Sequence, residues 1–332
     1  MPQQDATDTT TLSYWLNWRF FCCAFSVLLP TVLAFHVIWK DIRSRKFTSG
    51  KGEHHREGAL YGDEAWKPCL KEIHPVFLLV FRIIAFSSLL ASLVSKFCVN
   101  GGSIFFYYTQ WTFALVTIYF GCASVLSVYG CYQHNRSSTT SNVGTARLDA
   151  EQGPYMPLLH QDTTNRSRID HLANPHAEMQ NNHITPVWSY IFQILFQMNA
   201  GAVMLTDCVY WIIIFPFLTL KDYDFTFMTV NMHTLNVFFL LGDAALNCLP
   251  VQWFGMSFFV LWTSIYVIFQ WTIHAFFWIW WPYPFLTLES PYSPLWYLLI
   301  ALLHIPCYAM FKLIVDTKHY FLSKWFPSST QF

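Results

Sequence analysis

Polar side chains recur at helical spacing within an otherwise apolar stretch between residues 228 and 249. His233, Asn236, Asp243 and Asn247 share one face of a helix in this stretch, with Leu240 between them. Ionisable and amide groups are costly in an apolar segment unless they face a partner or a cavity. This face therefore predicts a polar interior within a helical bundle.

A hydroxyl and two imidazoles are expected at a similar depth in that interior. Thr109 lies six residues after Ser103, and His233 five residues after Met228, where two apolar segments begin. At about 1.5 Å per residue, both lie roughly 8–9 Å from the segment start. His274 approaches the same level from the opposite direction. A threonine beside an imidazole has the minimum equipment for nucleophilic acyl transfer, because the ring can take and return the hydroxyl proton.

Other interpretations of these residues remain open. A threonine in a membrane helix commonly bonds a carbonyl of its own helix, and a buried histidine commonly serves packing. A metal bound by His233, His274 and Asp243 would be a further alternative, but these segments lack a His-x-x-x-His or Glu-x-x-His pair. We therefore expect no metal and no cofactor.

Four further residues are candidates for contacts with a substrate or for support of the reacting groups. Gln110, Trp111 and Asn236 carry N–H donors that could stabilise an oxyanion, although their spacing selects none of them. His274 would lie in the same layer.

The composition predicts that these groups belong to an integral membrane protein. Of the 332 residues, 54% are hydrophobic, 19% are aromatic and 11% are charged, whereas soluble domains are nearer a quarter charged. The formal net charge is zero, which argues against nucleic-acid binding.

Seven apolar stretches are long enough to cross a bilayer as helices, which takes roughly 20 residues. The predicted fold is therefore an all-α bundle of about seven transmembrane helices. The stretches are Arg19–Trp39, Pro75–Ser95, Ser103–Gly130, Trp188–Leu218, Met228–Leu249, Trp253–Trp280 and Ser293–Asp316.

The distribution of basic residues predicts the orientation. Fourteen Lys and Arg residues fall in the loops on one side and three on the other. Because cytosolic loops carry the basic excess, the N-terminus is expected to be extracytosolic and the C-terminus cytosolic, in the endoplasmic reticulum or plasma membrane.

This topology divides the chain into five regions. Residues 131–186 are rich in Ser, Thr, Asn, His and Gln and are predicted to be largely disordered. The regions are an extracytosolic tail (1–18), three transmembrane helices with a basic cytosolic loop at 40–74 (19–130), the loop 131–186, four transmembrane helices (187–316) and a cytosolic tail (317–332).

Three short motifs resemble the androgen-induced-gene membrane protein family, which includes the androgen-dependent regulator of tissue factor pathway inhibitor. Asn231-Met232-His233-Thr234 resembles the family's Asn-His-x-Met-His-Thr region. The segment with His274 leads into Tyr283-Pro284-Phe285-Leu286, similar to the family's Tyr-Pro-Phe-Leu. Tyr107-Tyr108-Thr109-Gln110-Trp111 resembles its Tyr-Leu-Thr helix start and also the Rolling stone proteins. The resemblance covers about residues 103–318, interrupted by the long loop.

The resemblance implies a membrane-embedded threonine hydrolase that cleaves fatty acid esters of hydroxy fatty acids. By motif position, Thr109 would be the nucleophile and His233 the base, acting on a membrane lipid. The alternative is a non-enzymatic membrane protein: a transporter, a receptor-like protein or a protein of cell adhesion or fusion. A transporter would use Asp207, Asp243 and the histidines as an ion path. It would then lose activity on Asp207→Asn and tolerate Thr109→Ala, whereas a hydrolase would do the reverse. Protein partners are not predicted.

Overall fold

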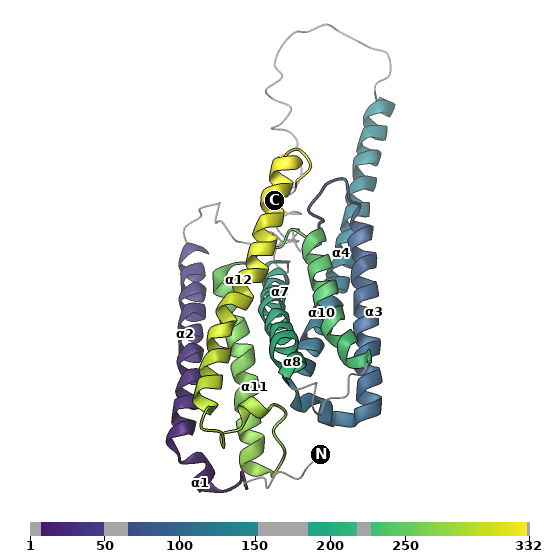
Figure 1. Cartoon of the computed structure of the whole chain (residues 1–332). Coiled ribbons are helices and arrows are strands. Elements are labelled where there is room, and N and C mark those ends of the chain that lie inside the picture. Colours follow the sequence, from purple (N-terminus) through teal and green to yellow (C-terminus); the bar gives the residue numbers. More distant parts are fainter. Residues whose placement is uncertain (1–7, 50–65, 152–184, 218–226, 331–332) are drawn as a thin grey trace.

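The computed structural model describes residues 8–49, 66–151, 185–217 and 227–330, and within these ranges the regular structure is helical, without β-strands (Figure 1). The fold is an all-α membrane bundle, as the sequence predicts. Its longer helices are α2 (Trp18–Ser49), α3 (Pro75–Asn100), α4 (Tyr108–Glu151), α7 (Thr185–Cys208), α10 (Phe227–Leu246), α11 (Met256–Phe276) and α12 (Ser293–Trp325). The shorter ones are α1 (Leu12–Trp15), η1 (Gly101–Phe106), η3 (Val209–Ile214), α8 (Phe215–Phe217), η4 (Trp253–Gly255) and η5 (Pro284–Leu286).

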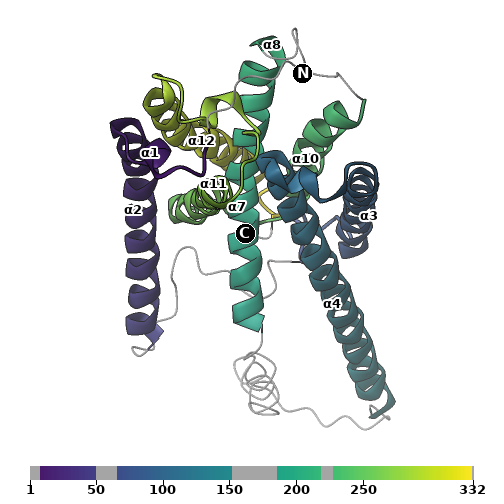
Figure 2. The same cartoon turned by 90° about the horizontal axis from the view of Figure 1, so that it is seen from below.

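Helix α7 lies at the centre of the bundle. It packs against α4 and α10 on one side and against α11 and α12 on the other. Figure 2 shows the two groups seen along the bundle, with α2, α11 and α12 on one side of α7 and α3, α4 and α10 on the other. Side chains on α7 can therefore reach both groups.

Six helices among the described residues are long and apolar enough to cross a membrane: α2, α3, α4, α7, α11 and α12. Helix α10 corresponds to the remaining predicted segment, and its 20 residues span about 30 Å, the thickness of a hydrocarbon core. The outward faces suit lipid. On α2, for example, Phe21 is 60% exposed and Phe25 65% exposed.

The predicted boundaries need three corrections. Helix α4 continues to Glu151, so residues 131–151 belong to a helix and not to a disordered loop. The extension of an existing helix needs no new nucleation step. For the same reason α2 runs into the predicted loop 40–74 and ends at Ser49, while α12 runs to Trp325 through the predicted tail. Residues 50–65 and 152–184 lie outside the described part of the chain.

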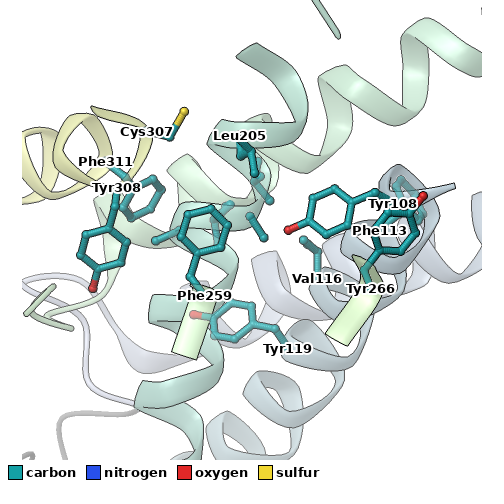
Figure 3. Close-up of a cluster of buried hydrophobic side chains, with 14 of the residues drawn as sticks. Tyr108, Phe113, Val116, Tyr119, Leu205, Phe259, Tyr266, Cys307, Tyr308 and Phe311 are labelled. Carbon is teal, nitrogen blue, oxygen red and sulfur yellow. The ribbon is translucent and has the colours of Figure 1, made fainter. Parts of the chain in front are cut away.

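The core along α7 combines aromatic rings with small residues. Figure 3 shows part of it, including Tyr119 of α4, Phe259 of α11 and Phe311 of α12. Gly201 allows α7 and α11 to pack closely, because a Cβ atom at this position would lie 2.2 Å from the ring of Phe259. Small residues allow such close helix contacts in membranes.

A buried ionic network connects α3, α4 and α10. Arg82 Nε donates to Asp243 Oδ1 at 2.7 Å, and both side chains are 0% exposed. Arg82 Nη1 also donates to Ser127 Oγ at 2.7 Å. Tyr119 and Asn247 donate to the second carboxylate oxygen of Asp243. The polar face of α10 therefore turns inward. At its Asp243 end, both carboxylate oxygens already accept hydrogen bonds.

Candidate functional site

The other end of the polar face of α10 carries a second buried pair. His233 Nδ1 lies 3.0 Å from Asp207 Oδ1 of α7, and His233 and Asp207 are 5% and 8% exposed. With Asp207 ionised and the ring neutral, Nδ1 carries the hydrogen of this bond and Nε2 keeps its lone pair. No described residue bonds Nε2. This is the arrangement of an imidazole oriented by a carboxylate and able to accept a proton.

A local change of helix type fixes the other face of this imidazole. Directly after Asp207 and Cys208, the chain forms a π-helical turn, η3. The Tyr210 ring in this turn stacks on His233, with centroids 3.7 Å apart and planes at 9°. π-Turns inside α-helices often occur at functional sites. The stacking and the carboxylate bond together hold the ring of His233 in one orientation.

Thr109 lines a cavity of about 60 Å³ at the same end of the bundle, which we call the Thr109 cavity. A water-sized group needs roughly 10–15 Å³, so the cavity holds several. The surface of its wall is almost entirely apolar, although six of the thirteen lining residues carry a hydroxyl, among them Thr206, Thr263 and Tyr283. The backbone N–H of Thr109 donates to the Tyr283 hydroxyl at 3.4 Å. The Tyr-Pro-Phe-Leu motif thus lies against the start of α4.

Thr109 lies on α4 between residues that contact α10 and α7, but neither His233 nor any other residue of α10 is among the residues that line the Thr109 cavity. The Gln110 amide nitrogen lies 3.5 Å from Met232 Sδ of α10, and Thr206 Oγ1 of α7 lies 3.3 Å from Thr112 Oγ1. At about 100° per residue, Thr109 leaves the helix between these two directions. The Asp207–His233 pair bridges α7 and α10 on this side. Within the described residues, no hydrogen bond joins Thr109 and His233.

The candidate oxyanion donors differ in what they already bind. The indole N–H of Trp111 donates to Phe105 O at 2.8 Å, which leaves it no hydrogen for a substrate. The Gln110 amide nitrogen has only the thioether of Met232, a weak acceptor. Asn236, 2% exposed, follows His233 by three residues on the inward face of α10. Of the three, Gln110 and Asn236 are therefore the residues whose amide hydrogens are more available to an oxyanion.

His274 is near the same end of the bundle but has a different environment. Its Nδ1 donates to Gln270 O at 2.8 Å, and its ring stacks on Trp281 at 3.7 Å. His274 does not line the Thr109 cavity. These contacts hold His274 against the segment between α11 and η5, and none of them involves His233.

Three buried oxygens on residues of the candidate site have no hydrogen-bond donor among the described residues. They are Asp207 Oδ2, Asn236 Oδ1 and Gln110 Oε1. Such groups are expensive inside a membrane protein, and they ordinarily bond water or a ligand. Within the described ranges, no group of three or more His, Cys, Asp or Glu side chains is placed to hold a metal ion. The unpaired oxygens therefore mark this region as one that binds water or a polar ligand group.

Sequence reasoning considered Asp207 for an ion path but not as the partner of His233, and it did not single out Tyr210. Asp207 is the only acidic residue between Trp188 and Leu218, a signal that could have identified it as the partner of a basic side chain. Tyr210 had no such signal, because a tyrosine in an apolar segment is ordinary and the π-turn depends on packing.

The sequence matches no family model, and neither a curated protein nor a solved structure matches it.

Proposed function

We propose that this chain is a membrane-embedded hydrolase of lipid esters, with Thr109 as nucleophile and His233 as general base. The observation that carries the proposal is the 3.0 Å contact between His233 Nδ1 and Asp207 Oδ1. It leaves Nε2 available as the acceptor of a hydroxyl proton. A buried carboxylate that orients an imidazole is the arrangement that activates hydroxyl nucleophiles in other hydrolases.

The reaction follows the chemistry of acyl transfer. His233 Nε2 takes the proton from Thr109 Oγ1 as this oxygen attacks the ester carbonyl carbon and forms a tetrahedral oxyanion. The oxyanion collapses, the alkoxide leaves with the proton from His233, and the acyl group stays on Thr109. Water then attacks the acyl ester, again with His233 as base, and releases the fatty acid and free Thr109. Amide hydrogens of Gln110 and Asn236 would stabilise the oxyanions.

The substrate class follows from the surroundings of Thr109. The apolar wall of the Thr109 cavity suits an acyl chain, and a lipid ester can enter sideways from the bilayer. Fatty acid esters of hydroxy fatty acids are the substrates that the sequence resemblance implies. The excess of basic residues at the opposite end of the bundle supports a site in the extracytosolic leaflet of the endoplasmic reticulum or plasma membrane.

The test combines active-site labelling with hydrolysis. Membranes with the wild-type chain should react with a fluorophosphonate probe and hydrolyse branched fatty acyl esters. Thr109→Val, which keeps the side-chain shape and removes the hydroxyl, should do neither. His233→Ala should lower the rate by about 10²–10⁴-fold, the usual contribution of a general base.

A matched control lies on the same helix. Thr117 is buried and donates its hydroxyl to Phe113 O at 2.8 Å, so Thr117→Val removes a comparable group outside the site and should keep activity. If Thr109→Val and Thr117→Val label and hydrolyse equally, the chain is no threonine hydrolase, and a non-enzymatic role such as transport takes its place.

Because Asp207 contacts His233, the variant Asp207→Asn no longer distinguishes a transporter from a hydrolase. Asp207→Asn was expected to impair only a transporter, but in a hydrolase it would also disturb the tautomer of His233. Thr109→Val therefore distinguishes the two classes, and Asp207→Asn does not.

A further inference from the structure

A second cavity of about 60 Å³ lies between α2, α11 and α12, and we call it the His304 cavity. Ser26 and Pro30 of α2, Ser264 of α11, and Tyr297, Ala301 and His304 of α12 are among its lining residues. It shares part of its wall with the Thr109 cavity, including Val267 and Ile300. Neither Thr109 nor His233 lines it, so the mechanism above does not use it.

The hydroxyl groups of this cavity wall that come from α2 and α11 are already engaged. Ser26 Oγ donates to Cys22 O at 3.0 Å. Ser264 Oγ donates to Val260 O and accepts from Thr31. Thr263 Oγ1 lies 2.9 Å from the Tyr108 hydroxyl. The hydroxyl of Tyr297 likewise donates to Leu286 O at 3.0 Å. These side chains need no ligand.

His304 is the exception, because one of its ring nitrogens has no partner among the residues that the structure describes. The side chain is 6% exposed. Its Nδ1 lies 2.8 Å from Ile300 O, and a carbonyl only accepts, so Nδ1 is the donor. The neutral ring then presents Nε2 as an acceptor, and no described residue bonds it. Stacking on Phe259, with centroids 4.4 Å apart, holds the ring in place.

Helix α2 contributes a second acceptor to the same cavity. Pro30 has no N–H, so the carbonyl of Ser26, four residues earlier, lacks its usual helical donor. Both residues line the cavity. In hydrocarbon, an unpaired carbonyl is costly and attracts a donor from a neighbour or a ligand.

The geometry points to the His304 cavity as a binding site for the hydroxyl end of a long-chain alcohol from the bilayer. A hydroxyl has one hydrogen, which it can donate to His304 Nε2 or, after rotation, to Ser26 O. The chain of the ligand would lie along the lipid-exposed surface of α2, where Phe25 is 65% and Leu29 45% exposed. A carboxylate would bring acceptors to acceptors, and a plain hydrocarbon would leave both groups unpaired. This binding does not depend on hydrolysis at Thr109.

The experiment uses the full chain in lipid nanodiscs and two photoreactive, alkyne-tagged probes: hexadecanol and a matched hexadecane without the hydroxyl. Hexadecanol should label peptides of α2 and α12 about three- to tenfold more than the hydrocarbon, the range expected from one hydrogen bond. Excess untagged hexadecanol should remove this label.

Three variants localise the effect. His304→Phe removes the acceptor and should reduce hexadecanol labelling to the level of the hydrocarbon. Ala301→Phe should have the same effect by filling the cavity, since Ala301 lines the His304 cavity and not the Thr109 cavity. Leu302→Phe is the control, because Leu302 is 54% exposed on the outer surface of α12, and it should label like wild type.

Equal labelling by the two probes in the wild-type chain would overturn the inference without any variant. So would unchanged hexadecanol labelling in His304→Phe or Ala301→Phe chains that remain monodisperse. Ester hydrolysis by the same preparations is a separate readout, so failure of the proposed hydrolase and failure of this site are distinguishable.

Discussion

The buried ion pair between Arg82 and Asp243 gives the sharpest prediction about stability. Asp243→Leu would leave the guanidinium without a counterion, at a position that is 0% exposed. The contact with Ser127 Oγ at 2.7 Å would remain, but it does not neutralise the charge. Tyr119 and Asn247 would also lose their acceptor. Removal of one partner of a buried pair costs about 3–5 kcal/mol, and we expect Asp243→Leu to reach this range.

The reverse single variant should cost less. In Arg82→Met, the carboxylate of Asp243 keeps the hydrogen bonds from Tyr119 and Asn247, so we expect a loss of about 3 kcal/mol, the lower end of the range. In the double variant Arg82→Met/Asp243→Leu, no charge is left unpaired. Buried ion pairs can be replaced by apolar groups at little cost, so the double variant should be more stable than Asp243→Leu alone.

Reversible unfolding of the purified chain in mixed micelles, titrated with sodium dodecyl sulfate, measures these free energies. The double-mutant cycle should give a coupling energy of at least about 2 kcal/mol, well above the roughly 0.6 kcal/mol average for hydrogen bonds between membrane helices. An additive cycle would refute the reasoning. The matched control is Asp316→Ala, which breaks the exposed pair with Lys312 on α12 and should cost no more than about 0.5 kcal/mol.

Two further variants test packing and charge. Gly201→Ala should destabilise the chain by about 1–3 kcal/mol in the same unfolding assay, because the new Cβ would overlap the ring of Phe259; Gly102→Ala, which meets nothing within 4 Å, should be neutral, and equal effects would contradict the close contact. Hydrogen bonding to Cys248, together with His319 and Lys318, lowers the pKa of Cys69, in the loop before α3, from 9.0 to about 5. A depressed pKa stabilises the fold above the pKa of the unfolded thiol and loses this contribution as pH falls toward 5. The stability difference between wild type and Cys69→Ala should therefore grow from about pH 5 to pH 9, and a flat difference would show that Cys69 is a neutral thiol.

Several features of the fold could be predicted because they depend on local composition and period. The apolar stretches are long enough to span a bilayer, and each corresponds to a long helix in the structure. The polar face of α10, with Asp243 on it, is readable from spacing alone. The helix ends were less predictable, because α4 continues into polar sequence where no apolar pattern marks its course.

In the candidate site, too, some residues could be predicted from the sequence, whereas their contacts could not. Thr109 and His233 could be singled out as a hydroxyl and an imidazole at similar depth near the starts of two helices. Their partners could not. The bond between His233 and Asp207, the stack on Tyr210 and the position of Thr109 against Tyr283 each depend on how one helix is rotated against another.

The amino-acid sequence by itself therefore determined that this protein is a helical membrane bundle with polar groups in its interior, because hydrophobic length and helical period are properties of consecutive residues. Only the tertiary structure decided which polar groups meet. Arg82 and Asp243 are 161 positions apart in the chain, and their pairing depends on the rotation and crossing of α3 and α10. At this crossing Gly242 of α10 lies against Phe81 of α3, where a Cβ atom would come within 2.6 Å of the ring.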